Sequence, residues 1–267
     1  MAAKSGRPAA FFDLDKTIIA KSSTLAFSRP FYQGGLISRA SVLRSGYAQF
    51  VFLVGGADHD QMERMRRYLS DQAAGWDVQT VKDIVADTLH RIVDPIVYDE
   101  AVQLIEQHHV EGRDVVIVSA SGTEVVEPIG EMLGADRVIG TVMVQADGRY
   151  TGEIEFYAYA ANKATAIVAL AEREGYDLAA SFAYSDSSTD IPMLEVVGHP
   201  SAVNPDKILR KVATERGWPV LDFVRPVKLR KRMSFEARRT TLATVAVGAG
   251  AAAAGVVVFA SRKAKRD

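Results

Sequence analysis

Two aspartates, Asp13 and Asp15, lie two residues apart at the end of the apolar stretch 9–14. One carboxylate of such a pair could attack a phosphorus atom, while the other protonates the leaving oxygen and then activates water. The two groups could also bind Mg²⁺, a hard cation that prefers oxygen ligands and retains some of its waters. A helix N-cap or a solvated turn would use the same residues, so the pair alone leaves both interpretations open.

Two further positions could act on a phosphate group. Ser119 follows the apolar run Val-Val-Ile-Val, and its hydroxyl could bind a phosphoryl oxygen together with the backbone N–H groups of Ala120 and Ser121 at a helix start. Lys163 stands at the start of a helical pattern, where its ammonium group could neutralise a carboxylate nucleophile and a phosphate. If each residue is considered alone, Ser119 could instead be a plain helix cap and Lys163 a surface lysine.

A second acidic pair, Asp186 and Asp190, follows the apolar stretch 181–184. Asp186 could supply a further carboxylate to a metal ion, and Asp190 could orient the groups around that ion. An acidic loop capping a helix that starts near Ile191 would have the same residues. The order of all these motifs along the chain is therefore more informative than any one of them.

Three apolar stretches, residues 9–14, 114–118 and 181–184, are predicted to be buried strands. Each is followed by small, hydroxyl-bearing or acidic residues, and helical patterns separate them. This arrangement predicts an α/β fold with a site at the carboxyl ends of the strands.

The long segment between the first two strands has apolar residues at helical spacing and is predicted to be an inserted helical cap. Its last helix is expected at residues 99–109, leading back into the sheet. A β-hairpin is predicted later in the chain, with strands at 142–145 and 150–156 joined by the turn residues Asp147 and Gly148.

The composition excludes several classes of function. A chain of 267 residues can bury a core domain plus an inserted one, and its formal net charge of -1 gives no chain-wide attraction to nucleic acid. The absence of cysteine excludes disulfides, thiolate metal sites and a cysteine nucleophile. The histidines, including His108 and His109, are expected to be exposed rather than to bind metal, and Trp76 and Trp218 to pack against apolar surface.

In this order, with a cap-length insertion after the first motif, the motifs resemble the haloacid dehalogenase (HAD) superfamily of hydrolases, in particular its phosphoserine-phosphatase-like branch, subfamily IB. The resemblance implies a Rossmann-like parallel sheet with an inserted helical cap and a Mg²⁺-dependent phosphatase that forms an aspartyl phosphate. By resemblance, Asp13 is the nucleophile and Asp15 is the general acid and base. Thr17, Ser119 and Ala120 would contact the phosphate, and Lys163 would be the charge clamp. The Mg²⁺ ligands would be Asp13, Asp186 and the Asp15 carbonyl, and Asp190 would orient these ligands.

The chain departs from phosphoserine phosphatases at the positions that would hold the substrate. Those enzymes have a glutamate nine residues after the nucleophile to hold the substrate amine, and this chain has Ser22 there. Their substrate-carboxylate arginine has no unambiguous counterpart among Arg39, Arg44 and Arg64. Lys16 replaces the common Gly or Ser and could either point away from the site or add positive charge at its entrance. Phosphoserine is therefore not the favoured substrate.

The C-terminal segment 240–260 carries no charge and is rich in Ala and Gly. A helix there, at about 1.5 Å per residue, could cross a hydrocarbon layer of roughly 30 Å, although an Ala-rich packing helix or a tail would suit the same composition. More basic residues precede this segment than follow it, which favours a cytoplasmic catalytic domain. The expected organisation is an α/β core at 1–21 and 110–224, a helical cap at 22–109, a basic linker at 225–239 and a transmembrane helix at 240–260.

The function expected from the sequence is a membrane-tethered phosphomonoester hydrolase for a small-molecule or lipid-headgroup phosphate. A phosphotransferase that passes the aspartyl phosphate to an alcohol is one alternative, and a non-enzymatic, membrane-tethered regulatory protein is another. Localisation without a membrane span, in the cytoplasm, also remains open, and the sequence sets no expectation for oligomeric state.

Overall fold

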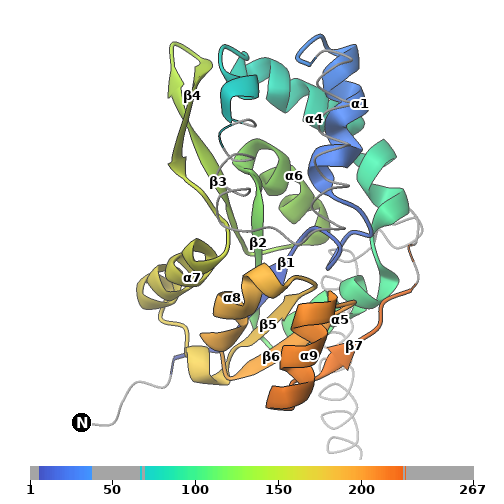
Figure 1. Ribbon diagram of the computed structural model, residues 1–267, viewed down its shortest axis with the longest axis vertical. Coiled ribbons are helices and arrows are strands. Elements are labelled where there is room, and N and C mark those ends of the chain that lie inside the picture. Colours follow the sequence, from blue (N-terminus) through green and yellow to red (C-terminus); the bar gives the residue numbers. More distant parts are fainter. Residues whose placement is uncertain (1–5, 38–66, 68–69, 225, 227–267) are drawn as a thin grey trace, which may run out of the picture. The chain divides into compact units, whose positions relative to one another are not determined.

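The computed structural model describes residues 6–37, 67, 70–224 and 226, which are built around a seven-stranded sheet (Figure 1). The strand order is β4-β3-β2-β1-β5-β6-β7, and every pair of neighbours is parallel except the β3–β4 hairpin. The strands are β1 (Ala9–Asp13), β2 (Asp114–Gly122), β3 (Arg137–Ala146), β4 (Arg149–Phe156), β5 (Phe182–Ser185), β6 (His199–Val203) and β7 (Val220–Leu221).

The three predicted strands form the centre of this sheet. β1 is buried along its whole length and pairs with β2 on one side and β5 on the other, with Phe12 opposite Ile117 and Tyr184. A strand buried on both faces needs apolar residues throughout, which is why β1 reads as a continuous apolar run. The predicted hairpin is also confirmed, with both turn residues, Asp147 and Gly148, at positive φ.

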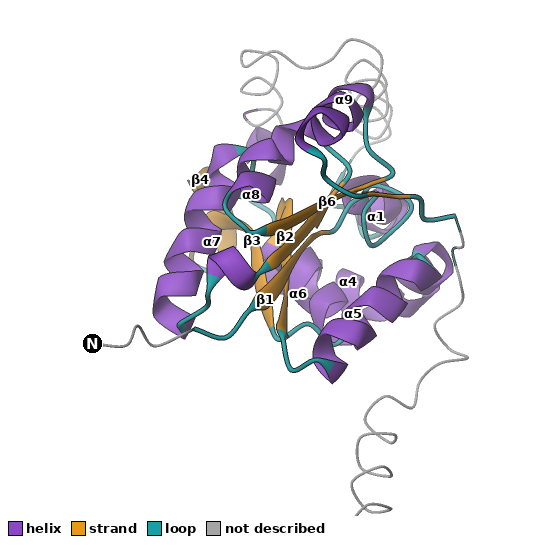
Figure 2. Ribbon diagram, turned by 90° about the horizontal axis from the view of Figure 1, so that it is seen from below, coloured by secondary structure: helices purple, strands orange, loops and turns teal. Residues whose placement is uncertain are grey.

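Helices cover both faces of the sheet (Figure 2). The α-helices are α1 (Ser23–Gln33), α4 (Val78–Val93), α5 (Asp99–Val110), α6 (Thr123–Leu133), α7 (Ala161–Glu174), α8 (Ile191–Glu195) and α9 (Lys207–Arg216), with short 3-10 helices η1 (Asp94–Ile96), η2 (Leu178–Ala180) and η3 (Ser188–Asp190). On one face of the sheet, apolar residues of β1, β2 and β5 pack with α7, α8 and α9. The other face is covered by α5 and α6, the helices before and after β2.

The insertion after β1 leaves and re-enters the core through two paired segments. Ala20 N–H donates to Ile96 O at 2.7 Å, and Tyr98 N–H donates to Ile18 O at 2.9 Å. We call this pair of hydrogen-bonded segments the hinge. Beyond it, α1 packs against α4, as expected for a helical cap. α5 lies on the core side of the hinge, where it contacts β2, although we predicted it as the last helix of the cap at 22–109.

The β3–β4 hairpin also contacts the inserted segment. Gly75 N–H donates to Tyr150 O at 2.8 Å, and Tyr150 N–H donates to Trp76 O at 3.0 Å. Tyr150 is buried in a small apolar cluster with Val78 and Val81 of α4, against which Trp76 packs. Trp218 packs against the main core, so the expectation for both tryptophans is confirmed.

One sequence-based expectation is wrong in this part of the molecule, and two strands were missed. His108 is only 2% exposed, because it packs against Phe12. Its Nε2 forms a hydrogen bond of 2.9 Å with the hydroxyl of Tyr184. The strands β6 and β7 were not predicted, because His199, Pro200 and Ser201 interrupt the apolar pattern of β6 and β7 has only two residues.

The predicted linker, apart from Pro226, and the predicted transmembrane helix at 240–260 lie outside the described residues. Within the described part of the chain, no helix combines the length and the apolar character needed to cross a membrane.

Candidate active site

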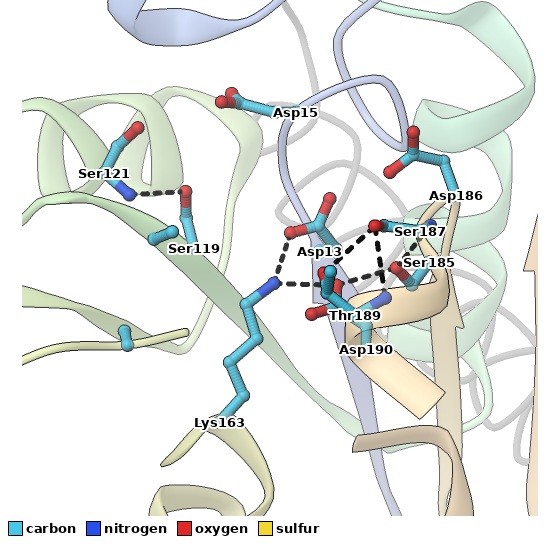
Figure 3. A network of polar contacts seen from close by, with 12 residues as sticks. Asp13, Asp15, Ser119, Ser121, Lys163, Ser185, Asp186, Ser187, Thr189 and Asp190 are labelled. Carbon is cyan, nitrogen blue, oxygen red and sulfur yellow. Dashed lines mark hydrogen bonds and ion pairs between the residues drawn. The ribbon is translucent and has the colours of Figure 1, made fainter. Parts of the chain in front are cut away.

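The centre of the candidate site is an ion-paired cluster in which Lys163 lies between two aspartates (Figure 3). Its Nζ donates to Asp13 Oδ1 at 2.6 Å and to Asp190 Oδ2 at 2.8 Å, and its side chain is only 3% exposed. Asp13 ends β1, Lys163 lies in the first turn of α7, and Asp190 ends η3. Ser185 Oγ donates to the same Asp190 oxygen at 2.7 Å, which fixes that carboxylate. The structure therefore brings together three of the predicted site residues.

Burial controls the charges in this cluster. It raises the pKa of Asp13 to about 7, and the effect is opposed by nearby Lys163 and reinforced by Asp190 and Asp15. Burial by itself would lower the pKa of Lys163, but its ion pairs with Asp13 and Asp190 more than offset this and raise the pKa above the ordinary value. Lys163 is consequently a fixed positive charge at neutral pH.

Asp186 lies on one side of Asp13, at the end of β5 (Figure 3). Burial, followed by repulsion from Asp13, raises the pKa of Asp186 to about 8. The ammonium group of Lys16 is 4.0 Å from Asp186 Oδ2, so its side chain points into the site rather than away from it. Lys16 has a positive φ of 62°, an uncommon backbone conformation for a residue other than glycine.

These oxygen donors fit a hard divalent cation. Asp13 and Asp186 are both buried, and repulsion from Asp13 helps to raise the pKa of Asp186, so the site is short of positive charge and a cation would relieve that repulsion. Among the described residues, no group of three or more His, Asp or Glu side chains is arranged to hold a metal. The predicted Mg²⁺ set has only two carboxylates, since its third donor is the main-chain carbonyl of Asp15.

Asp15 lies on the opposite side of Asp13, towards Ser121 (Figure 3). Its Oδ1 accepts a hydrogen bond of 2.9 Å from the backbone N–H of Ser23, the first residue of α1. Burial raises the pKa of Asp15, although hydrogen bonds from the backbone and side chain of Ser23 act in the opposite direction. The proposed acid is thus held by the first helix after the hinge.

The segment after Ser119 differs from the prediction. We expected Ala120 and Ser121 at a helix start, but β2 continues to Gly122 and α6 begins at Thr123. The N–H of Ser121 donates to Ser119 Oγ at 3.2 Å, so this donor already has a partner within the chain. The error arose because these small residues suit a helix N-cap and a strand end equally well.

Thr17 is fully buried, and its Oγ1 has no hydrogen-bond partner within the described residues. A buried hydroxyl without a partner normally costs about 1–3 kcal/mol, which makes such a group uncommon in a stable core. This open hydroxyl is compatible with the predicted role of Thr17 as a phosphate contact.

Sequence patterns did not identify several residues that support the site. Ser23 and Ser185 hydrogen-bond the aspartates Asp15 and Asp190. Ala160, three residues before Lys163, has φ 50° and ψ −126°, a conformation normally reserved for glycine. Only the hydroxyl-rich sequence around the two serines could have suggested their role. Nothing in the sequence indicates the unusual backbone conformation of Ala160.

Comparisons with known proteins agree with this geometry. The sequence model of the haloacid dehalogenase-like hydrolases matches residues 10–195. An inhibition of morphological differentiation protein from Streptomyces azureus is 65% identical over 96% of this chain and 94% of its own. From Mycobacterium tuberculosis, a probable phosphatase is 58% identical over 97% of this chain and 90% of its own. A phosphoserine phosphatase from the same species is 33% identical over 97% of this chain and 82% of its own.

A solved structure with a similar fold comes from Bordetella pertussis and has no known function. It has a TM-score of 0.72 and 27% sequence identity, and the match covers 82% of this chain and 99% of that one.

Proposed function

The chain belongs to the haloacid dehalogenase-like hydrolases, in the branch that includes phosphoserine phosphatases, and we propose that it hydrolyses phosphate monoesters through an aspartyl phosphate formed on Asp13. The observation that carries this proposal is the buried contact of 2.6 Å between Lys163 Nζ and Asp13. A carboxylate can approach a phosphate dianion only where positive charge screens their repulsion, and Lys163 provides such a charge.

In the first step of the proposed reaction, an Asp13 carboxylate oxygen attacks phosphorus as the bond to the leaving oxygen breaks. Asp15 donates a proton to that oxygen, so an alcohol leaves. In the second step, Asp15 takes a proton from water, and the water oxygen attacks the phosphorus of the aspartyl phosphate. Inorganic phosphate leaves, and the Asp13 carboxylate is restored.

Mg²⁺ is the proposed cofactor, held by carboxylate oxygens of Asp13 and Asp186 and by the Asp15 carbonyl. When bound, it would neutralise phosphate charge and favour the ionised form of Asp13, whose pKa burial raises to about 7. Asp190 keeps Lys163 in place, while Thr17, Ser119 and the backbone of Ala120 are the proposed phosphate contacts.

The proposed substrate is a small-molecule or lipid-headgroup phosphate rather than phosphoserine. Ser22, at the hinge, is 9% exposed and cannot offer the negative charge that would hold a substrate amine. The phosphoserine phosphatase relative nevertheless makes phosphoserine an essential member of any test panel.

We further propose that the segment 240–260 anchors the protein in a membrane with the catalytic domain in the cytoplasm. The support is its uncharged sequence and the basic residues before it. Carbonate washing of cell membranes tests this proposal, because an anchored protein stays in the pellet and a peripheral one is released.

The function is tested by assaying the full-length protein in detergent against phosphoserine, glycerol phosphate, p-nitrophenyl phosphate and lysophosphatidic acid, with Mg²⁺ or with a chelator. Hydrolysis that requires Mg²⁺ is expected for at least one ester. Asp13→Asn should lower kcat by about 10⁴-fold or more and remain folded, because Asn has nearly the same shape but cannot act as the nucleophile. Retained activity in this variant, or formation of a phosphorylated acceptor in place of free phosphate, would contradict the proposed hydrolysis.

A further inference from the structure

A chain of hydrogen bonds connects Asp15 to Ser119 by way of α1. The backbone N–H of Ser23 donates to Asp15 Oδ1 at 2.9 Å, and the Ser23 hydroxyl lies 2.7 Å from that of Ser121. The backbone N–H of Ser121 in turn donates to Ser119 Oγ at 3.2 Å. The proposed proton donor and the proposed phosphate-binding serine are therefore connected through one residue of the insertion.

Ser23 is well suited to hold Asp15 in one position. It is completely buried, so its donors have no access to water, and it is the first residue of the 11-residue helix α1. Ser22, the N-cap residue, makes no side-chain capping hydrogen bond, so the carboxylate of Asp15 serves as the acceptor at this end of the helix. The partial positive charge of a helix N-terminus favours such a carboxylate.

The hydroxyl of Ser23 adds a constraint that its backbone cannot supply. The backbone N–H fixes the distance between Asp15 and α1, whereas the hydroxyl contact with Ser121 fixes α1 against the end of β2. Without the hydroxyl, Ser121 would lose its contact with α1, and the helix that anchors Asp15 would no longer be bonded to the end of β2.

We infer that Ser23 is a positioning residue that, together with Ser121, holds Asp15 where it can protonate the leaving oxygen. The inference rests on the proposed phosphatase function and deepens it, because it assigns a part of the reaction to the first helix of the insertion. Proton donation matters most for a poor leaving group, so loss of this positioning should depend on which alcohol leaves.

The test compares two substrates in the full-length protein with Mg²⁺ present. p-Nitrophenolate leaves readily without a proton, whereas the alkoxide of glycerol phosphate requires one. For Ser23→Ala, which keeps the backbone N–H, we expect kcat/KM for glycerol phosphate to fall by about tenfold or more, and kcat/KM for p-nitrophenyl phosphate by less than about threefold. We compare kcat/KM because it reports the step in which the alcohol leaves and excludes the later hydrolysis, in which Asp15 acts on water whatever the substrate. Ser121→Ala removes the same hydroxyl contact from its other side and should show the same selectivity.

Ser28→Ala is the matched control, because Ser28 lies in the same helix and its hydroxyl donates to the backbone carbonyl of Leu25, within α1, at 2.7 Å. It should leave both rates unchanged. Equal losses on both substrates in Ser23→Ala and Ser121→Ala would overturn the inference, and so would no loss in either. If Ser23→Ala does not fold, the selectivity of Ser121→Ala decides alone. A wild-type protein that hydrolyses neither ester would instead contradict the proposed function.

Discussion

The two ends of the central strands differ in how their charges are balanced. At the carboxyl ends, Asp13 and Asp186 are buried with pKa values raised to about 7 and about 8, respectively, and their nearest cations are Lys163 and, at 4.0 Å, Lys16. Two non-glycine residues with positive φ, Lys16 and Ala160, lie beside this end. Such features cost stability, and they are typical of functional sites.

At the amino ends, the acidic groups have partners. Asp114, the first residue of β2, forms an ion pair of 2.8 Å with Arg7 and accepts a hydrogen bond of 2.6 Å from Tyr176. Asp136 accepts from the backbone N–H of Val115 at 2.8 Å. The same strands therefore have paired charges at one end and, at the other, buried carboxylates with raised pKa values, where the proposed reaction would take place.

Lys163→Met should have the largest effect on stability, because it removes the cation between Asp13 and Asp190. We expect a loss of about 3 kcal/mol in the free energy of unfolding, since Asp13 and Asp190 would be left buried without a cation. We also expect kcat to fall by about 10²-fold or more. Denaturant titration and initial rates measure the two effects, and Lys207→Met, at an exposed position in α9, is the control. Unchanged stability would mean that this ion pair matters less than its geometry implies.

The pH dependence of stability should depend on His108, which lies beside the central strands. Burial, followed by the nearby charge of Arg113, lowers its pKa from 6.5 to about 4. Between these values the unfolded chain binds the proton and the folded chain does not, so stability is complete above pH 6.5 and declines as the pH falls towards 4. Urea titrations at pH 7 and pH 5 should show a larger decline in the wild type than in His108→Phe.

Ala160→Gly should stabilise the protein by about 1 kcal/mol, because glycine adopts positive φ without strain. Gly148→Ala should have the opposite effect of similar size. That residue has φ 76° and open space around it, so only its backbone conformation would suffer. Thermal unfolding of both variants tests whether strain at Ala160 is real, and a destabilised Ala160→Gly would argue against it.

Asp114→Asn should have the smallest effect and sharpen the contrast between the two ends. The side chain of Arg7 is 51% exposed, so their ion pair is worth at most about 1 kcal/mol. Turnover should be unchanged, because Asp114 lies at the opposite end of β2 from Ser119. A large loss of kcat in this variant would mean that the two ends are not independent.

Local sequence patterns were sufficient for the central part of the fold. A buried parallel strand needs a continuous apolar run, and this rule located β1, β2 and β5 to within a few residues. It could not locate β6, where Pro200 and Ser201 enter a strand because β5 already provides its hydrogen-bonding neighbour. Long-range pairing overrode local preference there.

The sequence by itself determined the family, the central strands and the candidate residues, because each depends on residue types at short spacing along the chain. Only the tertiary structure decided which of these residues meet, since Asp13 and Lys163 are 150 positions apart and their contact depends on how the sheet and α7 pack. It also decided that His108 is buried and that Ser23 holds Asp15. The burial of a polar side chain such as His108, and the partner that it meets, arise from packing against distant segments, which no local pattern encodes.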